Sequence, residues 1–382
     1  MKKILIYTAY EGHLSLAQTI QQSLTLAGFQ TKVVDIVSSK GLRLYTPFYR
    51  YFPFLFKFPY KISEADSIQK GFNLLAEKLL NKEIKKEIKT YQPDLIISTH
   101  FSYNPSLAQF LDYQKTPIPF INLVANPWTI HPLEFSSRTN LNLVYDQRGL
   151  KIGLQYKIPP EKIVTLGWLT RDNFYRQQSV TKIRKKLCFK KNIFTLLVCG
   201  GSEGTNMILK IIPGLLMVKK PLQVIIVCGT NKTLYKTIVS FKKIMQKINQ
   251  SKSPHLKNII HQLNIKIFQF TDQLPQLMAI ADLVIGKGGP NLLFETVAQK
   301  KPFFSICHIS GQEDDNLALI RKKSLGWVEE NPFKVITLLH KIINQPQILK
   351  SYQKTILQER LYNKTASDRL TKIVNQLIYS KG

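Results

Sequence analysis

Residues 281–316, ADLVIGKGGPNLLFETVAQKKPFFSICHISGQEDDN, carry the clearest fold pattern in this chain of 382 residues. A short apolar run at 282–285 is long enough for a buried strand, and a glycine turn follows it. Apolar residues at helical spacing predict a helix over 291–299, and the apolar run 302–306 indicates the next strand. A polar loop at 311–316 closes a unit whose order is strand, glycine turn, helix and strand.

The glycine turn suits a ligand that carries both phosphate and sugar. Gly288 and Gly289 lack side chains, so a ligand can approach the backbone, and free N–H groups at the helix start favour an anion. Glu295 lies one turn into the helix, where it is poorly placed for phosphate but well placed to accept hydrogen bonds from ribose hydroxyls. Gln312 and Glu313, in the polar loop, offer the polar groups that sugar hydroxyls require.

In this order the features resemble the nucleotide-sugar half of the GT-B glycosyltransferases that make glycosyldiacylglycerols. These are the monogalactosyldiacylglycerol synthases and the processive diacylglycerol glucosyltransferases; the peptidoglycan enzyme that adds N-acetylglucosamine to a lipid-linked precursor is a more distant relative. In that family a K-x-G-G/P turn, a helix with an E-A pair and a G-Q-E…N loop hold the UDP-sugar. The matching residues are Lys287, Gly289, Glu295, Gly311, Gln312, Glu313 and Asn316. Leu292 stands where a threonine is usual, and Asn291 is its candidate substitute.

The resemblance implies a GT-B fold, which is an α/β architecture of two Rossmann-like doubly wound domains that face each other across a cleft. A chain of this length also favours two domains over one. We expect an acceptor and membrane-binding domain at 1–175, a basic linker at 176–192 and a UDP-sugar-binding domain at 193–355. A C-terminal helix within 356–382 is expected to pack back on the first domain.

The composition of the chain limits the classes of partner that we expect it to bind. The formal net charge is +30, and the pI is near 9.9, which favours phosphates, anionic lipid surfaces or nucleic acid, although the base composition of the genome explains such lysine usage equally well. No RNP pattern, zinc module or basic zipper is present, so we expect no nucleic-acid partner. Four scattered cysteines, no signal sequence and no long apolar run favour a cytoplasmic protein that is peripheral on the inner face of the cell membrane.

The N-terminal residues predict a second site at the end of a strand. An apolar strand at 3–9 runs into a loop at 10–13, and a helix over 14–27 and a strand over 30–36 follow. Ligands of such sheets bind at the carboxyl ends of the strands, so His13 lies where chemistry is expected. The loop resembles the family's G-G-G-H loop, whose histidine is a proposed base for the acceptor hydroxyl. A helix-capping histidine is the alternative interpretation.

Residues 42–62, LRLYTPFYRYFPFLFKFPYKI, combine nine Phe or Tyr residues with basic residues and three prolines. The prolines prevent one continuous helix. Aromatic and basic side chains on short helical pieces suit a membrane interface, although they could also stack on bases or form a core flap. The family's acceptor and membrane segment follows the second strand too, which favours lipid. The residues assigned to it are Phe48, Tyr49, Arg50, Phe54, Phe56, Lys57 and Phe58.

The strand predicted at 120–125 is followed by Asn126-Pro127-Trp128-Thr129-Ile130-His131-Pro132, which resembles the family's V-T-D-…-T-x-H-P-x-W stretch. Thr129, His131 and Pro132 match, whereas Asn126 stands where an aspartate is usual. An amide cannot act as a base, so Asn126 and His131 are predicted to orient the acceptor. His100 and its neighbours, at the end of the strand 93–99, line the acceptor site or form a structural loop.

The second half contains further strand-end turns. Gly200, Gly201 and Ser202 follow a strand at 192–199 and resemble the family's G-G-S-x-G turn, as phosphate binding requires. Gly229 follows the strand 222–228 and resembles the family's C-G-x-N turn. Phe270 ends the strand predicted at 264–270, and Thr271 is predicted to begin the helix over which the family holds uracil.

Together these features predict an inverting glycosyltransferase that moves a hexose from UDP-glucose or UDP-galactose to a membrane lipid, with diacylglycerol as the first candidate acceptor. We expect no cofactor and no metal site, and we expect Lys287 and the backbone amides to meet the charge of the departing UDP. The alternatives are another GT-B activity, either a UDP-sugar 2-epimerase or a lipid-linked N-acetylglucosaminyltransferase, and a non-catalytic protein that binds UDP-sugar and membranes.

Overall fold

The computed structural model describes residues 1–38, 53–112, 118–250 and 263–379. The chain divides into two compact units, each built around a parallel sheet of six strands among the described residues. The first unit contains 1–38, 57–112, 118–172 and 361–379, and the second contains 53–56, 173–250 and 263–360. The prediction of two doubly wound α/β halves is confirmed.

The first unit has the strand order β2-β1-β3-β4-β5-β6. Its strands are β1 (Lys3–Tyr7), β2 (Gln30–Val34), β3 (Leu95–Ser98), β4 (Phe120–Leu123), β5 (Leu141–Val144) and β6 (Ile163–Thr165). Its helices are α1 (Tyr10–Leu26), α3 (Lys57–Ile62), α4 (Asp66–Tyr91), α5 (Asn104–Asp112), α6 (Gln147–Gln155) and α16 (Ala366–Tyr379). A 3-10 helix, η4 (Pro132–Glu134), follows β4.

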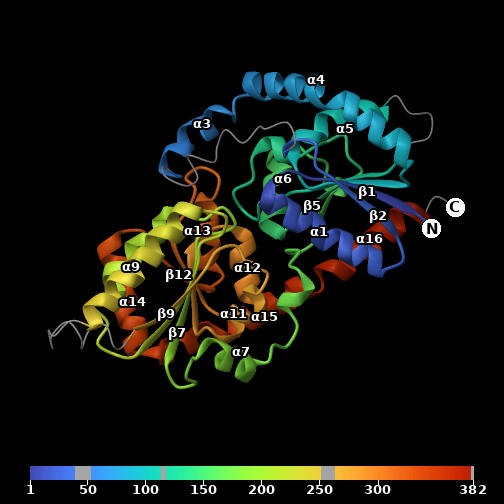
Figure 1. Cartoon of the computed structure of the whole chain (residues 1–382). Coiled ribbons are helices and arrows are strands. Elements are labelled where there is room, and N and C mark those ends of the chain that lie inside the picture. The colour runs from blue at the N-terminus through green and yellow to red at the C-terminus, as the bar shows by residue number, and fades with distance from the viewer. Residues whose placement is uncertain (39–52, 113–117, 251–262, 380–382) are drawn as a thin grey trace. The chain divides into compact units, whose positions relative to one another are not determined.

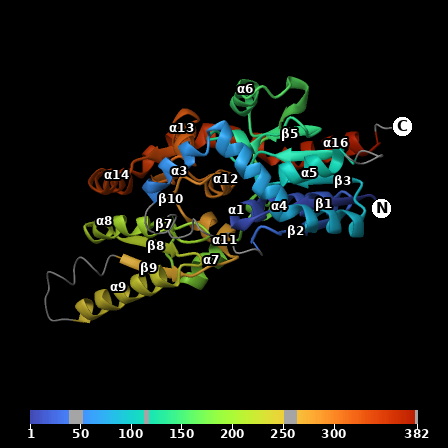
Figure 2. The ribbon, with the colours of Figure 1, turned by 90° about the horizontal axis from the view of Figure 1, so that it is seen from above.

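Helices cover both faces of this sheet. Helices α4 and α5 lie side by side over the face that carries Leu5 and Tyr7, and their apolar residues complete a buried core there (Figure 2). Helices α1 and α16 lie side by side on the other face, where the hydroxyl of Ser23 donates to that of Ser367 at 3.0 Å (Figure 1). The last helix of the chain is therefore part of the first unit.

The second unit has the order β12-β11-β10-β7-β8-β9. Its strands are β7 (Phe194–Cys199), β8 (Leu222–Val227), β9 (Leu263–Phe268), β10 (Leu283–Lys287), β11 (Phe303–Cys307) and β12 (Gly326–Val328). Its helices are α7 (Val180–Leu187), α8 (Ile212–Leu216), α9 (Lys232–Gln250), α11 (Leu274–Ile280), α12 (Pro290–Ala298), α13 (Asp314–Lys322), α14 (Pro332–Asn344) and most of α15 (Gln353–Lys364). Helices α9 and α14 cover one face of the sheet, and α11 and α12 cover the other (Figure 1).

The strand orders decide where ligands are expected. In each sheet the order reverses at one point, between β1 and β3 in the first unit and between β7 and β10 in the second. Doubly wound sheets bind ligands outside the carboxyl ends of the strands at such a point. Cys199, the last residue of β7, pairs in register with Gly286 of β10, so the turns that follow these two strands are neighbours.

Three loop predictions were wrong. Residues 10–13 form the first turn of α1, because Ala9 is extended and the Ser38 hydroxyl accepts the Tyr10 N–H at 2.9 Å, which satisfies an N–H at the helix start. The polar loop after β11 ends at Glu313, because Asp314 begins α13 and its carboxylate accepts the Gly311 N–H at 2.8 Å. The turn after β9 extends to Gln273, so Thr271 precedes α11 and does not begin it.

The segment 176–192, expected to be a basic linker, contains α7. This helix contacts α11 of the second unit. The guanidinium of Arg184 donates to the carbonyl oxygens of Ile280 and Lys190, each at 2.9 Å. Basic composition therefore marks a helix that belongs to the second unit.

Within the described ranges, none of the helices is both long and apolar enough to cross a membrane.

Candidate functional site

Two glycine turns pack backbone against backbone at the ends of β7 and β8. Gly204 and Gly229 have positive φ angles of +71° and +59°. A Cβ atom on Gly204 would lie 2.0 Å from the Cys228 carbonyl oxygen, and one on Gly229 would lie 2.2 Å from the Ser202 carbonyl oxygen. Both positions therefore exclude side chains. The predicted donor residues of these turns, Gly200, Gly201, Ser202 and Gly229, lie together.

We expect Gly204→Ala to lower the thermal midpoint of the protein and to weaken UDP binding. The added Cβ meets backbone at 2.0 Å and stands on a positive φ, which alone costs about 1–2 kcal/mol. The matched control is Gly71→Ala in α4, where a Cβ meets nothing within 4 Å and alanine is favoured by roughly 0.5–1 kcal/mol. Calorimetric melting measures the thermal midpoint, and titration with UDP measures the binding. Equal midpoints for the two variants would contradict the close backbone packing at Gly204.

Asn231 joins the two turns, a role that the sequence did not reveal. Its side chain is 2% exposed, and its Nδ2 donates to the Gly204 carbonyl at 2.7 Å. Its Oδ1 accepts the N–H of Leu234 at 2.9 Å in the first turn of α9. The asparagine of the C-G-x-N motif thus fixes the turn after β7 to the start of α9. The match to this motif was the feature of the sequence from which the role of Asn231 could have been predicted.

The turn between β10 and α12 contains a buried ion pair. Lys287 is the last residue of β10, and its ammonium contacts Glu313 Oε1. The side chains of Lys287 and Glu313 are 10% and 6% exposed, and the other carboxylate oxygen of Glu313 accepts the Ile309 N–H at 2.8 Å. A Cβ on Gly289 would lie 3.1 Å from the Lys287 ammonium nitrogen and 3.3 Å from Glu313 Oε1, so a glycine there leaves room beside the pair.

Other residues predicted for the donor lie on α12 and in the loop between β11 and α13, whereas Phe270 and Thr271 follow β9. Glu295 is buried in α12, and its charge adds to the effect of burial in raising the pKa of the Cys199 thiol at the end of β7. Gly289 caps α12, with Asn291 in its first turn and Gln312 half-buried in the loop before α13. Asn316 is fully buried and donates to the Gly288 carbonyl at 3.2 Å.

The two residues predicted to hold uracil lie after β9. Phe270 is 61% exposed, and the hydroxyl of its neighbour Thr271 accepts the Gln273 N–H at 3.1 Å.

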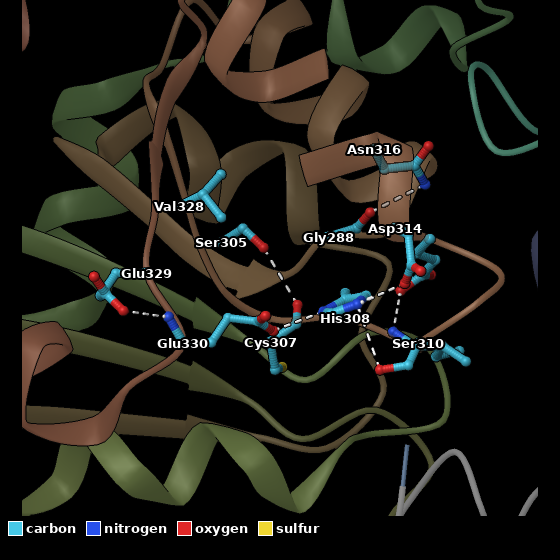
Figure 3. A network of polar contacts seen from close by, with 12 residues as sticks. Gly288, Ser305, Cys307, His308, Ser310, Asp314, Asn316, Val328, Glu329 and Glu330 are labelled. Atoms are coloured by element: carbon cyan, nitrogen blue, oxygen red, sulfur yellow. Dashed lines mark hydrogen bonds and ion pairs between the residues drawn. The ribbon is translucent and has the colours of Figure 1, made fainter. Parts of the chain in front are cut away.

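A histidine that sequence analysis did not select anchors the loop after β11 (Figure 3). His308 lies between two carboxylates: its Nδ1 is 2.7 Å from Glu330 and its Nε2 is 2.9 Å from Asp314. Burial opposes charge on the imidazole, but hydrogen bonds and charges of Glu330 and then Asp314 outweigh it and raise the pKa of His308. Because Glu330 is 22 residues from His308, no local spacing could have shown this anchor.

In the first unit, the backbone carbonyl of Thr99 fixes the ring orientation of His13. Its Nδ1 lies 2.6 Å from the Thr99 carbonyl oxygen, which can only accept a hydrogen bond. The neutral ring therefore carries its proton on Nδ1 and leaves the Nε2 lone pair available. Burial lowers the pKa of His13, while the Thr99 contact and Asp35 oppose this shift. His13, near the start of α1, is thus held in its neutral form against Thr99, the residue that follows β3.

His100 packs edge-on against His13, with ring centroids 4.6 Å apart. Burial and, to a smaller extent, His13 lower the pKa of His100 well below its usual value, and its Nδ1 accepts the Ser102 N–H at 3.3 Å. Its ring also stacks on Phe101. We predicted that His100 lines the acceptor site or forms a structural loop, and the structure places its ring in contact with that of His13.

Asn126 and His131 lie in the segment after β4. Asn126 Nδ2 donates to Glu134 Oε1 at 2.7 Å, and His131 Nδ1 accepts the Leu133 N–H at 3.1 Å. Burial lowers the pKa of His131 to about 4, and its Nε2 lies 3.1 Å from the Ser63 hydroxyl. His131 is therefore neutral and joins this segment to the end of α3.

The structure describes only part of residues 42–62, the segment that is rich in Phe and Tyr. Phe48, Tyr49 and Arg50 lie outside the described residues. Phe54 belongs to a 3-10 helix, η2 (Pro53–Phe56), whose last residue Phe56 is half-buried. Lys57 and Phe58 begin α3, which contains no buried residue, and Phe58 is 75% exposed.

Among the described residues, no group of three or more His, Cys, Asp or Glu side chains is arranged to hold a metal ion.

Two family models match this chain, and they match different halves. The model described as Monogalactosyldiacylglycerol (MGDG) synthase matches residues 13–168. The model described as Glycosyltransferase family 28 C-terminal domain matches residues 195–364. A processive diacylglycerol beta-glucosyltransferase of Bacillus cereus (strain G9842) is 24% identical over 342 residues, which cover 85% of this chain and 81% of that protein.

Solved structures share the fold. MurG of Acinetobacter baumannii superposes with a TM-score of 0.61 at 14% identity, over 98% of this chain and all of that one. Anabaena Alr3699/HepE in complex with UDP-glucose superposes with a TM-score of 0.52 at 17% identity, over all of this chain and 99% of that one.

Proposed function

This chain belongs to the glycosyltransferases related to the monogalactosyldiacylglycerol synthases and the processive diacylglycerol glucosyltransferases, and from that premise we propose that it transfers a hexose from a UDP-sugar to diacylglycerol at a membrane surface. The second unit binds the donor, and the first unit binds the acceptor. The observation that carries the proposal is the buried Lys287–Glu313 pair at the glycine turn where the strand order of the second sheet reverses.

The donor site stabilises the negative charge of a diphosphate with backbone N–H groups and with Lys287, and the proposal needs no cofactor. The turns after β7, β8 and β10 are glycine-rich, and α12 begins beside Lys287. Backbone N–H groups at such turns and at a helix start bind phosphate. When the bond from the anomeric carbon to UDP breaks, negative charge grows on the β-phosphate, and the Lys287 ammonium stabilises it. Glu295 accepts hydrogen bonds from the ribose hydroxyls.

The acceptor is activated by His13. Its Nε2 takes the proton of the acceptor hydroxyl as the oxygen attacks the anomeric carbon, and the bond to UDP breaks on the opposite side. This direct displacement inverts the anomeric carbon. The Thr99 carbonyl holds the ring orientation and stabilises the imidazolium that forms, because it accepts the Nδ1 proton.

UDP release from UDP-glucose and from UDP-galactose, with and without diacylglycerol vesicles and with and without EDTA, tests the proposal. We expect release that depends on diacylglycerol, that EDTA leaves unchanged, and that yields a lipid-bound hexose detectable by mass spectrometry. Conversion of the UDP-sugar without lipid would indicate an epimerase instead. UDP binding without turnover would indicate a non-catalytic relative.

The proposed membrane contact uses exposed apolar side chains of α3 and α4. Phe58 is 75% exposed, Leu74 67% and Leu75 54%, and the lysines of α3 are exposed as well. Apolar side chains beside lysines suit insertion between anionic headgroups, so we propose that this face docks on the inner leaflet of the cell membrane.

We expect the triple variant Phe58→Ser, Leu74→Ser and Leu75→Ser to lose sedimentation with vesicles of phosphatidylglycerol. Each large apolar side chain contributes about 1.5–3 kcal/mol when it is fully buried, so three should lower partitioning at least tenfold. Phe333→Ser is the control, because this side chain is 81% exposed, at least as much as the other three, and lies on α14 of the second unit. Sedimentation of the triple variant at the level of the control would contradict the docking face.

A further inference from the structure

The segment that follows β4, where Asn126 and His131 are predicted to orient the acceptor, contains a buried carboxyl group that the mechanism above does not use. Glu134 ends η4 and is 6% exposed. Its Oε1 accepts two hydrogen bonds, from Asn126 Nδ2 at 2.7 Å and from the His131 N–H at 3.2 Å. Its Oε2 is buried and has no hydrogen-bond partner within the described part of the chain. Leaving a buried carboxyl oxygen in this way costs free energy, so its presence calls for an explanation such as a function.

The segment around Glu134 is rigidly held. The Glu134 carbonyl oxygen accepts Asn122 Nδ2 at 2.7 Å, and Asn122 Nδ2 also donates to Asn142 Oδ1 at 2.8 Å. Asn122 and Asn142 are register partners on β4 and β5. The carboxyl group is therefore fixed relative to the sheet, at the same carboxyl edge of the strands as His13.

Two departures from the family pattern meet in this contact. In the stretch V-T-D-…-T-x-H-P-x-W, Asn126 stands at the aspartate and Glu134 stands at the tryptophan. The two side chains are hydrogen-bonded to each other. An aspartate at 126 would place a second carboxylate against Glu134 in a buried site, where like charges repel strongly. An asparagine supplies the N–H donor that Glu134 needs.

We propose that Glu134 is a positioning residue that replaces the carboxyl group missing at position 126 and turns Asn126 so that its Oδ1 accepts a hydrogen bond from the acceptor hydroxyl. Because an amide is planar, the Nδ2 that binds Glu134 fixes the direction of the Oδ1. This inference rests on the proposed transfer to a lipid hydroxyl, and it adds a group that is specific to the acceptor.

The ionisation of Glu134 gives a readout that does not require turnover. Burial raises the pKa of Glu134 to about 7, against the hydrogen bonds from Asn126 and His131. Of the titratable groups around it, His131 has a pKa of about 4, and the pKa of Tyr156 at the end of α6 is raised by burial and then by Glu64 and Glu134. Glu134 is thus the member of this cluster that ionises near neutral pH.

The sign of the pH effect follows from this shift. The folded protein holds a proton on Glu134 between its ordinary carboxyl pKa and about 7, whereas the unfolded chain does not. The stability that this proton supplies is present in acid and is lost as the pH rises through about 7. Glu134→Gln removes the titration, so its stability relative to the native protein should increase from pH 5 to pH 8.

The experiment compares four variants by turnover with 1,2-dioctanoylglycerol and by thermal melting between pH 5 and 8. Glu134→Leu should lower kcat/KM for the acceptor about 10- to 100-fold, as expected for losing a hydrogen bond to a charged group, with the KM for UDP-sugar unchanged. Glu134→Gln keeps an oxygen for Asn126 and should restore turnover to within a few-fold of the native protein. Asn126→Asp should lose activity most above pH 7, and Asn126→Asp with Glu134→Trp should recover activity relative to Asn126→Asp alone.

The outcomes separate this inference from the proposed function. A native protein that turns over no UDP-sugar refutes the lipid transfer. The inference is then decided by melting: a pH dependence that Glu134→Gln removes supports the Asn126–Glu134 pair, and one that it leaves unchanged overturns the pair. If the native protein is active, full acceptor turnover by Glu134→Leu overturns the positioning role. Equal losses for acceptor and donor would overturn it too, because they would indicate general damage to the fold.

Discussion

His13→Ala should lower kcat by about 10²- to 10⁴-fold, the usual range for the loss of a general base. UDP binding should be unchanged, because His13 belongs to the first unit and the donor turns belong to the second. The reason is geometric: the Thr99 carbonyl fixes the Nδ1 proton of His13, so the Nε2 alone can accept the proton of the acceptor hydroxyl. Steady-state turnover and UDP calorimetry measure the two quantities.

The acid limb of the pH profile gives a second readout for His13. Burial lowers its pKa, so the neutral ring persists below pH 6.5, and kcat/KM should stay constant past that point before it falls in acid. The matched control is His340→Ala, since His340 also contacts a carbonyl oxygen, that of Gly214, at 2.7 Å in the second unit. Equal turnover for His13→Ala and His340→Ala would refute the role of His13.

Lys287→Ala should abolish measurable UDP binding and destabilise the second unit by about 3–5 kcal/mol, because it leaves the buried Glu313 carboxylate without its ammonium partner. Replacing the pair by Lys287→Met and Glu313→Leu together should recover stability, since apolar residues of similar volume often substitute for a buried ion pair. The double variant should still fail to bind UDP. Urea denaturation and calorimetry thus separate the structural role of the pair from its role in binding.

Lys323→Ala is the matched control for Lys287. Lys323 contacts Glu359 at 3.0 Å in the same unit, with side chains 24% and 9% exposed, but this pair lies at the other end of α13 from the donor loop. We expect the control to lose some stability and to bind UDP normally. Wild-type affinity for UDP in Lys287→Ala would contradict the donor site.

Much of the fold could be predicted because its signals are local. Apolar runs and helical spacing located the buried strands to within a few residues, and glycines marked the turns after β7, β8 and β10. The errors occurred where a distant or flanking group decides a helix start. Ser38 satisfies the N–H of Tyr10, 28 residues away, so the helix begins earlier than its apolar pattern indicates.

The sequence by itself determined two parallel α/β units and the residue types at their strand ends, since periodicity and glycine positions act over neighbouring residues. Only the tertiary structure decided which of those residues meet. Lys287 pairs with Glu313 across 26 residues, His13 bonds to Thr99 across 86, and His308 is held by Glu330 across 22. Such contacts depend on the order in which parallel strands lie side by side, and that order places distant strand ends at one edge of a sheet.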